Sequence, residues 1–190
     1  MRLKKLTALL LCLSMIFTLT ACSKTQVNLF GIKQRVKNIN PREVTLDVFV
    51  PEEALMPMVN AVDKYKYVKT GVSIRLTLDD GVMLAEKVLS GYSCDVLIDF
   101  SMIMDQVDAS RGEDVNPSGY DCIYSDTRRD IFEGPADSEL AEQTGAETLV
   151  YSAALTRACK YSDEAKEFVE FLMSEEARKI YTECDFTVIE

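Results

Sequence analysis

Acidic side chains gather at three places where an apolar, strand-like run gives way to a helix-like run. They are accompanied by a glycine and a serine, and the candidate ligand-binding residues are Glu52, Glu53, Asp79, Asp80, Gly81, Asp99 and Ser101. Carboxylate oxygens bind hard cations such as Ca²⁺, and they also pair with cationic solutes. If the three places meet at one rim, the sequence predicts a small-molecule or ion site lined by carboxylates.

A simpler role for the same acids is structural. Acidic residues just ahead of a helix interact favourably with its positive end, and Asp and Ser cap exposed backbone N–H groups. On that interpretation the acids cap helices and face water, which is the commoner arrangement. The sequence leaves both roles open.

A βαβ unit over Val72–Asp108 positions most of these residues. Val72–Leu78 alternates apolar and polar residues, as a strand with one buried face does. Apolar residues from Val82 to Leu89 recur at helical spacing, and Val96–Ile98 is a short apolar strand typical of a parallel sheet. Open α/β sheets bind ligands at the carboxyl ends of such strands.

Further elements extend this unit on both sides. We predict strands at 44–50 and 148–155, a turn at 51–53, helices from there to about 65 and at 102–107, 162–172 and 175–181, and an extended end at 186–189. Pro57 belongs in the first turn of its helix, and Ser101, Ser162 and Ser174 are the expected N-cap residues. The predicted fold is α/β, with a mainly parallel sheet flanked by helices.

The stretch from Ala109 to Glu147 has a different character. It is rich in acids, Gly, Ser and Pro, and shows no strand–helix alternation. A loop of this length is unusual inside a compact domain, so it indicates a functional loop, disorder or a lost element. Its one basic pair, Arg128–Arg129, could bind an anion or offset neighbouring acids on a solvated loop.

The N-terminus has the pattern of an export signal. Residues 1–21 combine an early basic group, an apolar centre and small residues before Cys22. This looks like the lipobox of bacterial lipoproteins, which implies cleavage before Cys22 and lipidation of its thiol. Residues 22–42 form a basic tether, and residues 43–190 form the folded domain. The expected location is the outer face of a cell membrane, held there by lipid.

Charge and composition exclude several functions. The segment from Glu43 onward holds 13 basic and 31 acidic residues, or −18, and nucleic-acid binding needs the opposite sign. The chain has no histidine, no Gly-x-Ser-x-Gly motif and no zinc-ligand spacing. We therefore predict neither an enzyme nor a metal or cofactor protein of a standard type.

Four cysteines remain after the signal and the lipidation site: Cys94, Cys122, Cys159 and Cys184. An exported protein can form disulfides, and four cysteines allow three pairings. Cys94 adjoins a buried strand and is expected to be a core residue. Cys159 with Cys184 is the favoured pair, since two consecutive helices could bring their ends together.

Three pieces of the chain resemble the bacterial solute-binding proteins of ABC importers, nearest the molybdate-binding type. They are the βαβ unit with Cys94-Asp-Val-Leu-Ile98, the strand at Val150–Leu155, and the closing run from Ser162 to Phe186. The resemblance implies a type II periplasmic-binding-protein fold, an ABC permease as partner, and ligand held between two lobes. The resemblance also implies that the second lobe is truncated here, with the acidic, irregular stretch 109–147 as its remnant.

The resemblance does not extend to the ligand. Members of the family that bind oxyanions supply serines from the turns after the first two strands, whereas the turns here hold Glu52–Glu53 and Asp79–Asp80. A carboxylate facing molybdate would repel it. The sequence thus indicates a solute-binding lipoprotein divergent in ligand binding. The alternatives are a surface interaction module on the same scaffold and a divalent-cation binder.

Overall fold

The computed structural model describes residues 43–109, 122–135, 145 and 148–189. The predicted signal segment 1–21, the tether 22–42 and Cys22 lie outside those residues, as do 110–121, 136–144 and 146–147. Within the described part of the chain, no helix has both the length and the apolar character that a membrane span requires.

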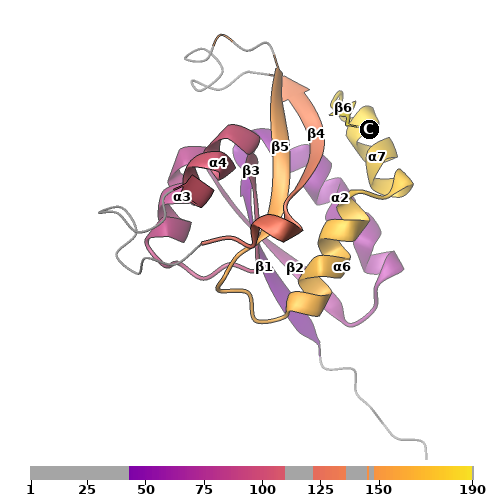
Figure 1. Cartoon of the computed structure of the whole chain (residues 1–190). Helices are drawn as coiled ribbons and strands as arrows, with labels where there is room; N and C mark the ends of the chain where they lie inside the picture. Colours follow the sequence, from indigo (N-terminus) through magenta and orange to yellow (C-terminus); the bar gives the residue numbers. More distant parts are fainter. Residues whose placement is uncertain (1–42, 110–121, 136–144, 146–147, 190) are drawn as a thin grey trace, which may run out of the picture. The chain divides into compact units, whose positions relative to one another are not determined.

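One six-stranded sheet lies at the centre of the fold, in the spatial order β2-β1-β3-β5-β4-β6 (Figure 1). The strands are β1 (Val44–Pro51), β2 (Val72–Asp79), β3 (Val96–Phe100), β4 (Arg129–Pro135), β5 (Thr148–Leu155) and β6 (Thr187–Val188). β1 pairs in parallel with β2 and β3, β5 runs antiparallel to β3 and β4, and β6 runs antiparallel to β4. Two of the five strand pairings are parallel and three are antiparallel. The predicted α/β class is confirmed, but the sheet is mixed, because the strands after β3 pair in antiparallel fashion.

Helices cover both faces of this sheet (Figure 1). α2 packs with α6 and α7, whereas α3 packs with α4 on the other side. The helices are α2 (Leu55–Val68), α3 (Gly81–Leu89), α4 (Ser101–Ala109), α6 (Ser162–Leu172) and α7 (Glu175–Glu183), with short 3₁₀ turns η1 (Glu52–Ala54) and η2 (Ser125–Thr127). All five residues of β3 are buried because this strand has helices on both faces.

The strand order reverses between β1 and β3. The chain passes from β1 through α2 to β2 on one side, then through α3 to β3 on the other side of β1. Because parallel crossovers are right-handed, α2 and α3 fall on opposite faces of the sheet. This switch point lies at the carboxyl ends of β1 and β3, and α/β sheets commonly bind ligands there.

β4 is the main element that the sequence did not predict, since we expected the stretch 109–147 to be irregular. Its register with β5 shifts between Asp130 and Phe132, as at a β-bulge. The shift lets the consecutive residues Ile131 and Phe132 both be buried, so the strand lacks the alternation that marks a half-buried strand. Its pairing partners, β5 and β6, are also distant in sequence.

Two of the three predicted serine caps are wrong. Ser174 caps α7 by accepting the backbone N–H of Ala177 at 3.3 Å, as expected. Ser162 lies inside α6, whose N-cap residue is Tyr161. Ser101 likewise lies inside α4, where its hydroxyl turns toward the sheet rather than to the helix backbone.

The predicted pairing of Cys159 with Cys184 is also wrong. Cys94, Cys122, Cys159 and Cys184 are all free thiols. α6 and α7 follow one another along the sheet instead of folding back, which separates the cysteine before α6 from the one after α7 (Figure 1). The Sγ of Cys184 instead accepts a hydrogen bond from the side-chain amide of Asn60 at 3.5 Å.

Candidate functional site

The carboxyl edge of the parallel strands holds every residue predicted for the ligand site. Glu52 and Glu53 form η1 directly after β1, Asp79 ends β2, and Asp80 and Gly81 open α3. Asp99 lies near the end of β3, and Ser101 opens α4. The topology thus brings the three places to one rim, with the β1 and β3 ends flanking the switch point and the β2 end beside them.

Asp79 and Asp80 are occupied by structural contacts. Asp80 is the N-cap residue of α3, and its Oδ1 accepts the backbone N–H groups of Val82 at 2.8 Å and Met83 at 3.4 Å. The ammonium of Lys87 donates to Asp79, and this hydrogen bond is the main reason why the pKa of Asp79 is lowered. For these two residues the structural role is the one the geometry supports.

Asp80→Ala is expected to lower the free energy of unfolding by about 1 kcal/mol, because two N–H groups at the start of α3 lose their acceptor. Asp80→Asn is the matched control, since an asparagine keeps the capping oxygen and removes only the charge. Urea denaturation of both variants measures the difference. Equal stability of the two would show that the cap does not stabilise α3.

Asp99 is the unusual member of the set. Its side chain is fully buried, its Oδ1 accepts the N–H of Phe100 at 2.8 Å, and its Oδ2 has no hydrogen-bond partner among the described residues. Burial raises the pKa of Asp99 well above its ordinary value, and the charges of Asp80 and Glu53 raise it further. The surroundings of Asp99 therefore favour the protonated form of its carboxyl group.

Gly81 makes room for this carboxyl group. A Cβ built at Gly81 would lie 2.5 Å from Oδ1 of Asp99 and 3.1 Å from Cδ1 of Ile103. Any side chain at position 81 would therefore displace Asp99 or the start of α4. The first turn of α3 rests directly on the buried carboxyl group only because residue 81 has no side chain.

Glu53 faces the same region from the end of β1. Its Oε2 is buried and has no hydrogen-bond partner in the described part of the chain, and its charge acts on Asp99. Two unsatisfied buried carboxyl oxygens from neighbouring strand ends require an explanation, because buried polar atoms are nearly always hydrogen-bonded. Donor groups supplied by a ligand or by water would satisfy both.

A second polar cluster lies beside Asp99 on the same row of the sheet, because Ser152 pairs with both Asp99 and Asp130. The hydroxyls of Ser101 and Ser152 lie 2.5 Å apart, and both donate to Oδ1 of Asp130. Sequence analysis missed Ser152 and Asp130. The sequence signal that could have revealed them is a polar residue next to buried apolar ones: Ser152 lies between Tyr151 and Ala153, and Asp130 directly precedes Ile131 and Phe132.

Arg128 fixes the start of α4 next to this cluster. Its guanidinium donates to Asp105 at 2.5 Å and to the backbone carbonyl of Ser101 at 2.9 Å. The sequence left two roles open for Arg128–Arg129, binding an anion or offsetting neighbouring acids. Arg128 has the second role, because its guanidinium pairs with Asp105. The cluster holds serine hydroxyls in place, but their hydrogens are directed to Asp130.

The rim does not form a metal cage. No group of three or more Asp, Glu or Cys side chains among the described residues is arranged to hold a metal ion. The buried part of the rim offers only Glu53 and Asp99, and Ca²⁺ requires six or more oxygen ligands.

Apolar side chains surround the rim. Those that are exposed lie in the first turns of α2 and α3 and at the end of β2, and they are Met56, Val59, Leu78, Val82 and Met83. Val82 begins the apolar run predicted for its helix, yet both Val59 and Val82 are more than one-third exposed.

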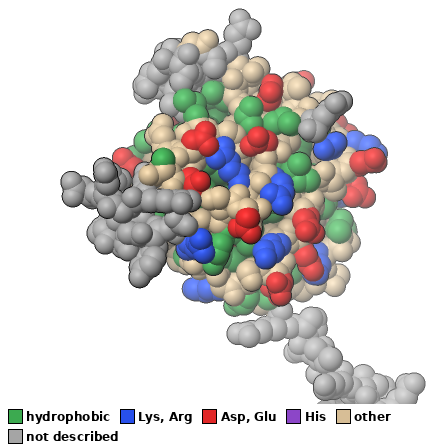
Figure 2. All heavy atoms as spheres, viewed as in Figure 1, with side chains coloured by type: hydrophobic (Ala, Val, Ile, Leu, Met, Phe, Trp, Pro, Cys, Tyr) green, Lys and Arg blue, Asp and Glu red, His purple; other side chains and the backbone are tan. Residues whose placement is uncertain are grey.

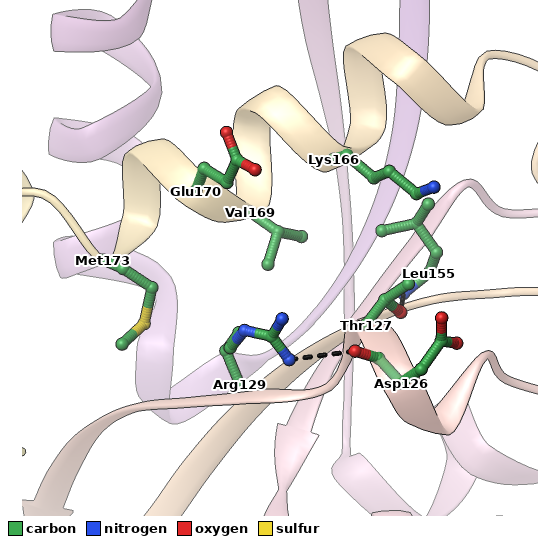
Figure 3. Close-up of a pocket in the computed structure, with 8 residues that line it drawn as sticks. All are labelled: Asp126, Thr127, Arg129, Leu155, Lys166, Val169, Glu170 and Met173. Carbon is green, nitrogen blue, oxygen red and sulfur yellow. Dashed lines mark hydrogen bonds between the residues drawn. The ribbon is translucent and has the colours of Figure 1, made fainter.

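A pocket of about 530 Å³ lies elsewhere, between η2, the end of β5 and α6 (Figure 3). Leu155 in its wall pairs with Val96 at the opposite end of β3 from the candidate site. Its charged lining residues, Asp126, Arg129, Lys166 and Glu170, are all exposed and balance in charge. Figure 2 shows acidic and basic side chains interspersed over this face of the molecule. The pocket therefore gives no sign of a specific ligand.

At the level of sequence, neither a protein-family model nor a curated protein matches the chain. Solved structures do match. The substrate-binding domain assigned to a molybdenum ABC transporter from Clostridium difficile superimposes with a TM-score of 0.60 at 16% identity, over 77% of this chain and 100% of that one. The Azotobacter vinelandii periplasmic molybdate-binding protein gives 0.61 at 10% identity, over 76% and 100%.

The sulfate-binding protein SubI from Mycobacterium tuberculosis H37Rv gives a TM-score of 0.55 at 8% identity, over 77% of this chain and 88% of that one. At such low identities the likeness shows the fold and leaves the ligand open. The chain therefore has the fold of periplasmic substrate-binding proteins, as the sequence predicted.

Proposed function

We propose that this chain is an exported solute-binding lipoprotein of an ABC uptake system, with its ligand at the switch point between β1 and β3. The shared fold supports a role in solute binding. The observation that carries the proposal is the pair of buried carboxyl oxygens, on Glu53 and Asp99, that have no partner among the described residues. Both project from strand ends at the place where this fold class binds ligands.

The chemistry of the rim favours a ligand that donates hydrogen bonds. Unpaired carboxyl oxygens can accept hydrogen bonds, and an N–H group of an ammonium or guanidinium would satisfy Oε2 of Glu53 with a charge-assisted bond. An oxyanion is disfavoured for a second reason besides charge: the carboxylate of Asp80 already accepts the N–H groups of Val82 and Met83 that would bind an anion at the start of α3. The proposed ligand class is a small cationic solute.

A thermal-shift panel tests this proposal with spermidine, molybdate, sulfate and Ca²⁺ as probes. Spermidine at 100 times its Kd should raise Tm by roughly 5 °C or more, and the other three should leave it unchanged. Glu53→Gln should weaken spermidine binding by roughly 10-fold or more, because a charge-assisted hydrogen bond becomes a neutral one. Glu86→Gln, an exposed acid on α3 away from the rim, is the matched control.

Attachment through lipid at Cys22 is a separate part of the proposal. Cys22→Ser should move the protein from the membrane fraction to the soluble fraction, since a protein without acyl chains lacks its anchor. The mass of the mature wild-type protein should exceed that of the polypeptide from Cys22 to Glu190 by the lipid. Equal partition of variant and wild type between the two fractions would contradict a lipid anchor.

The exposed apolar residues at the rim favour a second candidate, a surface interaction module that covers them with a partner protein. Met56, Val82 and Met83 would then lie in the contact. The thermal-shift panel separates the two candidates, because an interaction module responds to none of the small solutes. A shift with spermidine that Glu53→Gln abolishes favours solute binding.

A further inference from the structure

We propose that the open edge of β2 is a self-association surface, on which a second copy of this chain adds its own β2 in antiparallel orientation. β2 is the outermost strand on its side of the sheet and pairs only with β1 among the described residues. The surface is separate from the ligand site at the ends of β1 and β3, so the proposal goes beyond solute binding and does not depend on it.

The backbone of β2 has the geometry to accept another strand. Its register with β1 is unbroken over eight residue pairs, so the strand is regular along its whole length. The N–H of Val44 donates to the carbonyl of Gly71 at 2.9 Å, and backbone groups alternate in direction along a strand. The odd-numbered residues of β2 therefore face β1, whereas Ile74, Leu76 and Leu78 direct their N–H and C=O groups to the open edge.

The β2 edge lacks the features that usually keep edge strands apart. Exposed edges are commonly blocked by a proline, a lysine or a β-bulge, and Val72–Asp79 contains none of these. The one cationic residue of the strand, Arg75, directs its guanidinium to Asp47 on β1. At the other edge of the sheet, by contrast, the strand β6 has only two residues.

An apolar row along this edge is incompletely covered. Ile74 and Leu76 are only partly buried against the core, and Leu78 is 38% exposed. Because alternate residues of a strand share a face, these three side chains form one row. A second β2 would cover the row with its own, since a two-fold axis perpendicular to the sheet keeps both rows on the same face.

Charge selects the register of this pairing. The outward-pointing residues of the two strands must lie opposite one another, so the possible registers differ by steps of two residues. The register with Thr77 opposite Thr77 of the second copy also places Arg75 opposite Asp79, twice by symmetry, and opposite charges on facing residues stabilise an antiparallel pair. Leu76 then lies opposite Leu78. A register centred on Arg75 would bring two guanidinium groups together, and one centred on Leu76 would separate Arg75 from Asp79.

The test is cross-linking with copper phenanthroline as oxidant, in cells that express the full chain with Thr77→Cys as the reporter. Residues that face each other in a non-hydrogen-bonded antiparallel pair have Cα atoms about 4.5 Å apart, which suits a disulfide. The control is Thr45→Cys, because Thr45 is exposed on the same face of the sheet, one strand inward. Thr77→Cys should give at least about a tenfold higher yield of cross-linked dimer than this control. Both variants keep the native cysteines, so the difference reports on position 77.

Leu78→Lys is the disrupting variant, because a lysine at an outward-pointing position of an edge strand opposes pairing. Combined with Thr77→Cys, it should lower the dimer yield by roughly tenfold. Tyr92→Lys in the same background should leave the yield unchanged, since Tyr92 is an exposed residue beyond the end of α3. Equal yields for Thr77→Cys and Thr45→Cys would overturn the proposal. So would a cross-link from position 77 to a different protein, which would make the edge a site for another chain.

Discussion

Asp99→Asn is expected to raise the free energy of unfolding at pH 8.5 by about 1–3 kcal/mol relative to the wild type. The folded-state pKa of Asp99 lies above its unfolded value because of burial, so its contribution to stability is full below the unfolded pKa. That contribution is lost as pH rises through the folded pKa. An asparagine resembles the protonated carboxyl group in shape and never ionises, so the variant avoids the loss.

The gain should therefore be small near pH 4 and grow with pH, and urea denaturation across this range measures it. Asp63→Asn is the matched control, because Asp63 is exposed and forms a salt bridge with the exposed Lys66 one turn along α2. Its stability should follow the wild type at every pH. A constant difference between Asp99→Asn and wild type from pH 4 to 8.5 would mean that Asp99 does not hold a proton in the folded state.

Phe132→Ala is expected to lower the free energy of unfolding by about 3–5 kcal/mol. Phe132 is fully buried, and its ring lies 4.7–4.9 Å from those of Tyr151, Tyr181 and Phe186. These contacts join β4, β5, α7 and the chain end into one aromatic cluster. Its loss would loosen β4 and with it Asp130, which accepts from Ser101 and Ser152.

Tyr92→Ala is the control, since Tyr92 is 62% exposed and its removal should change stability by no more than about 0.5 kcal/mol. Chemical denaturation of both variants gives the comparison. Similar small effects for the two would show that the aromatic cluster is not a main source of stability. A spermidine response retained in a stable Phe132→Ala protein would place β4 outside the ligand site.

The elements that the sequence predicted well have local signals. β3 is a short apolar run, α3 begins at an Asp cap, and α7 begins at Ser174 with two acids behind it. The elements it missed depend on distant partners. β4 holds only two buried apolar residues in a bulged register, and its pairing with β5 and β6 is fixed by the fold rather than by its own pattern.

The same division applies to the candidate site. From their positions after predicted strands, the acids were expected at one rim. Those positions could not distinguish Asp80, which caps a helix, from Asp99, which is buried under Gly81. That difference depends on how α3 and α4 pack over β3. The sequence did not predict Ser152 and Asp130 as site residues, because it is strand pairing across the sheet that brings them next to Ser101.

The rim combines the fold of anion-binding transport proteins with a different local chemistry. An oxyanion would need free N–H groups at the start of α3, but the Asp80 carboxylate already accepts hydrogen bonds from them. At the switch point, where we propose that the ligand binds, the chain places the unpaired carboxyl oxygens of Glu53 and Asp99. The fold therefore predicts the position of the ligand, and the side chains at that position predict its charge.

The most direct test of this account is a carboxyl-carbon NMR titration of the protein with spermidine, followed by the same titration with molybdate. We predict that spermidine shifts the side-chain carboxyl signals of Glu53 and Asp99 and leaves those of Asp126 and Glu170, in the pocket beside α6, unchanged. Molybdate should shift none of the four. A molybdate-dependent shift at Glu53 or Asp99, or a spermidine response confined to Asp126 and Glu170, would contradict the proposed site.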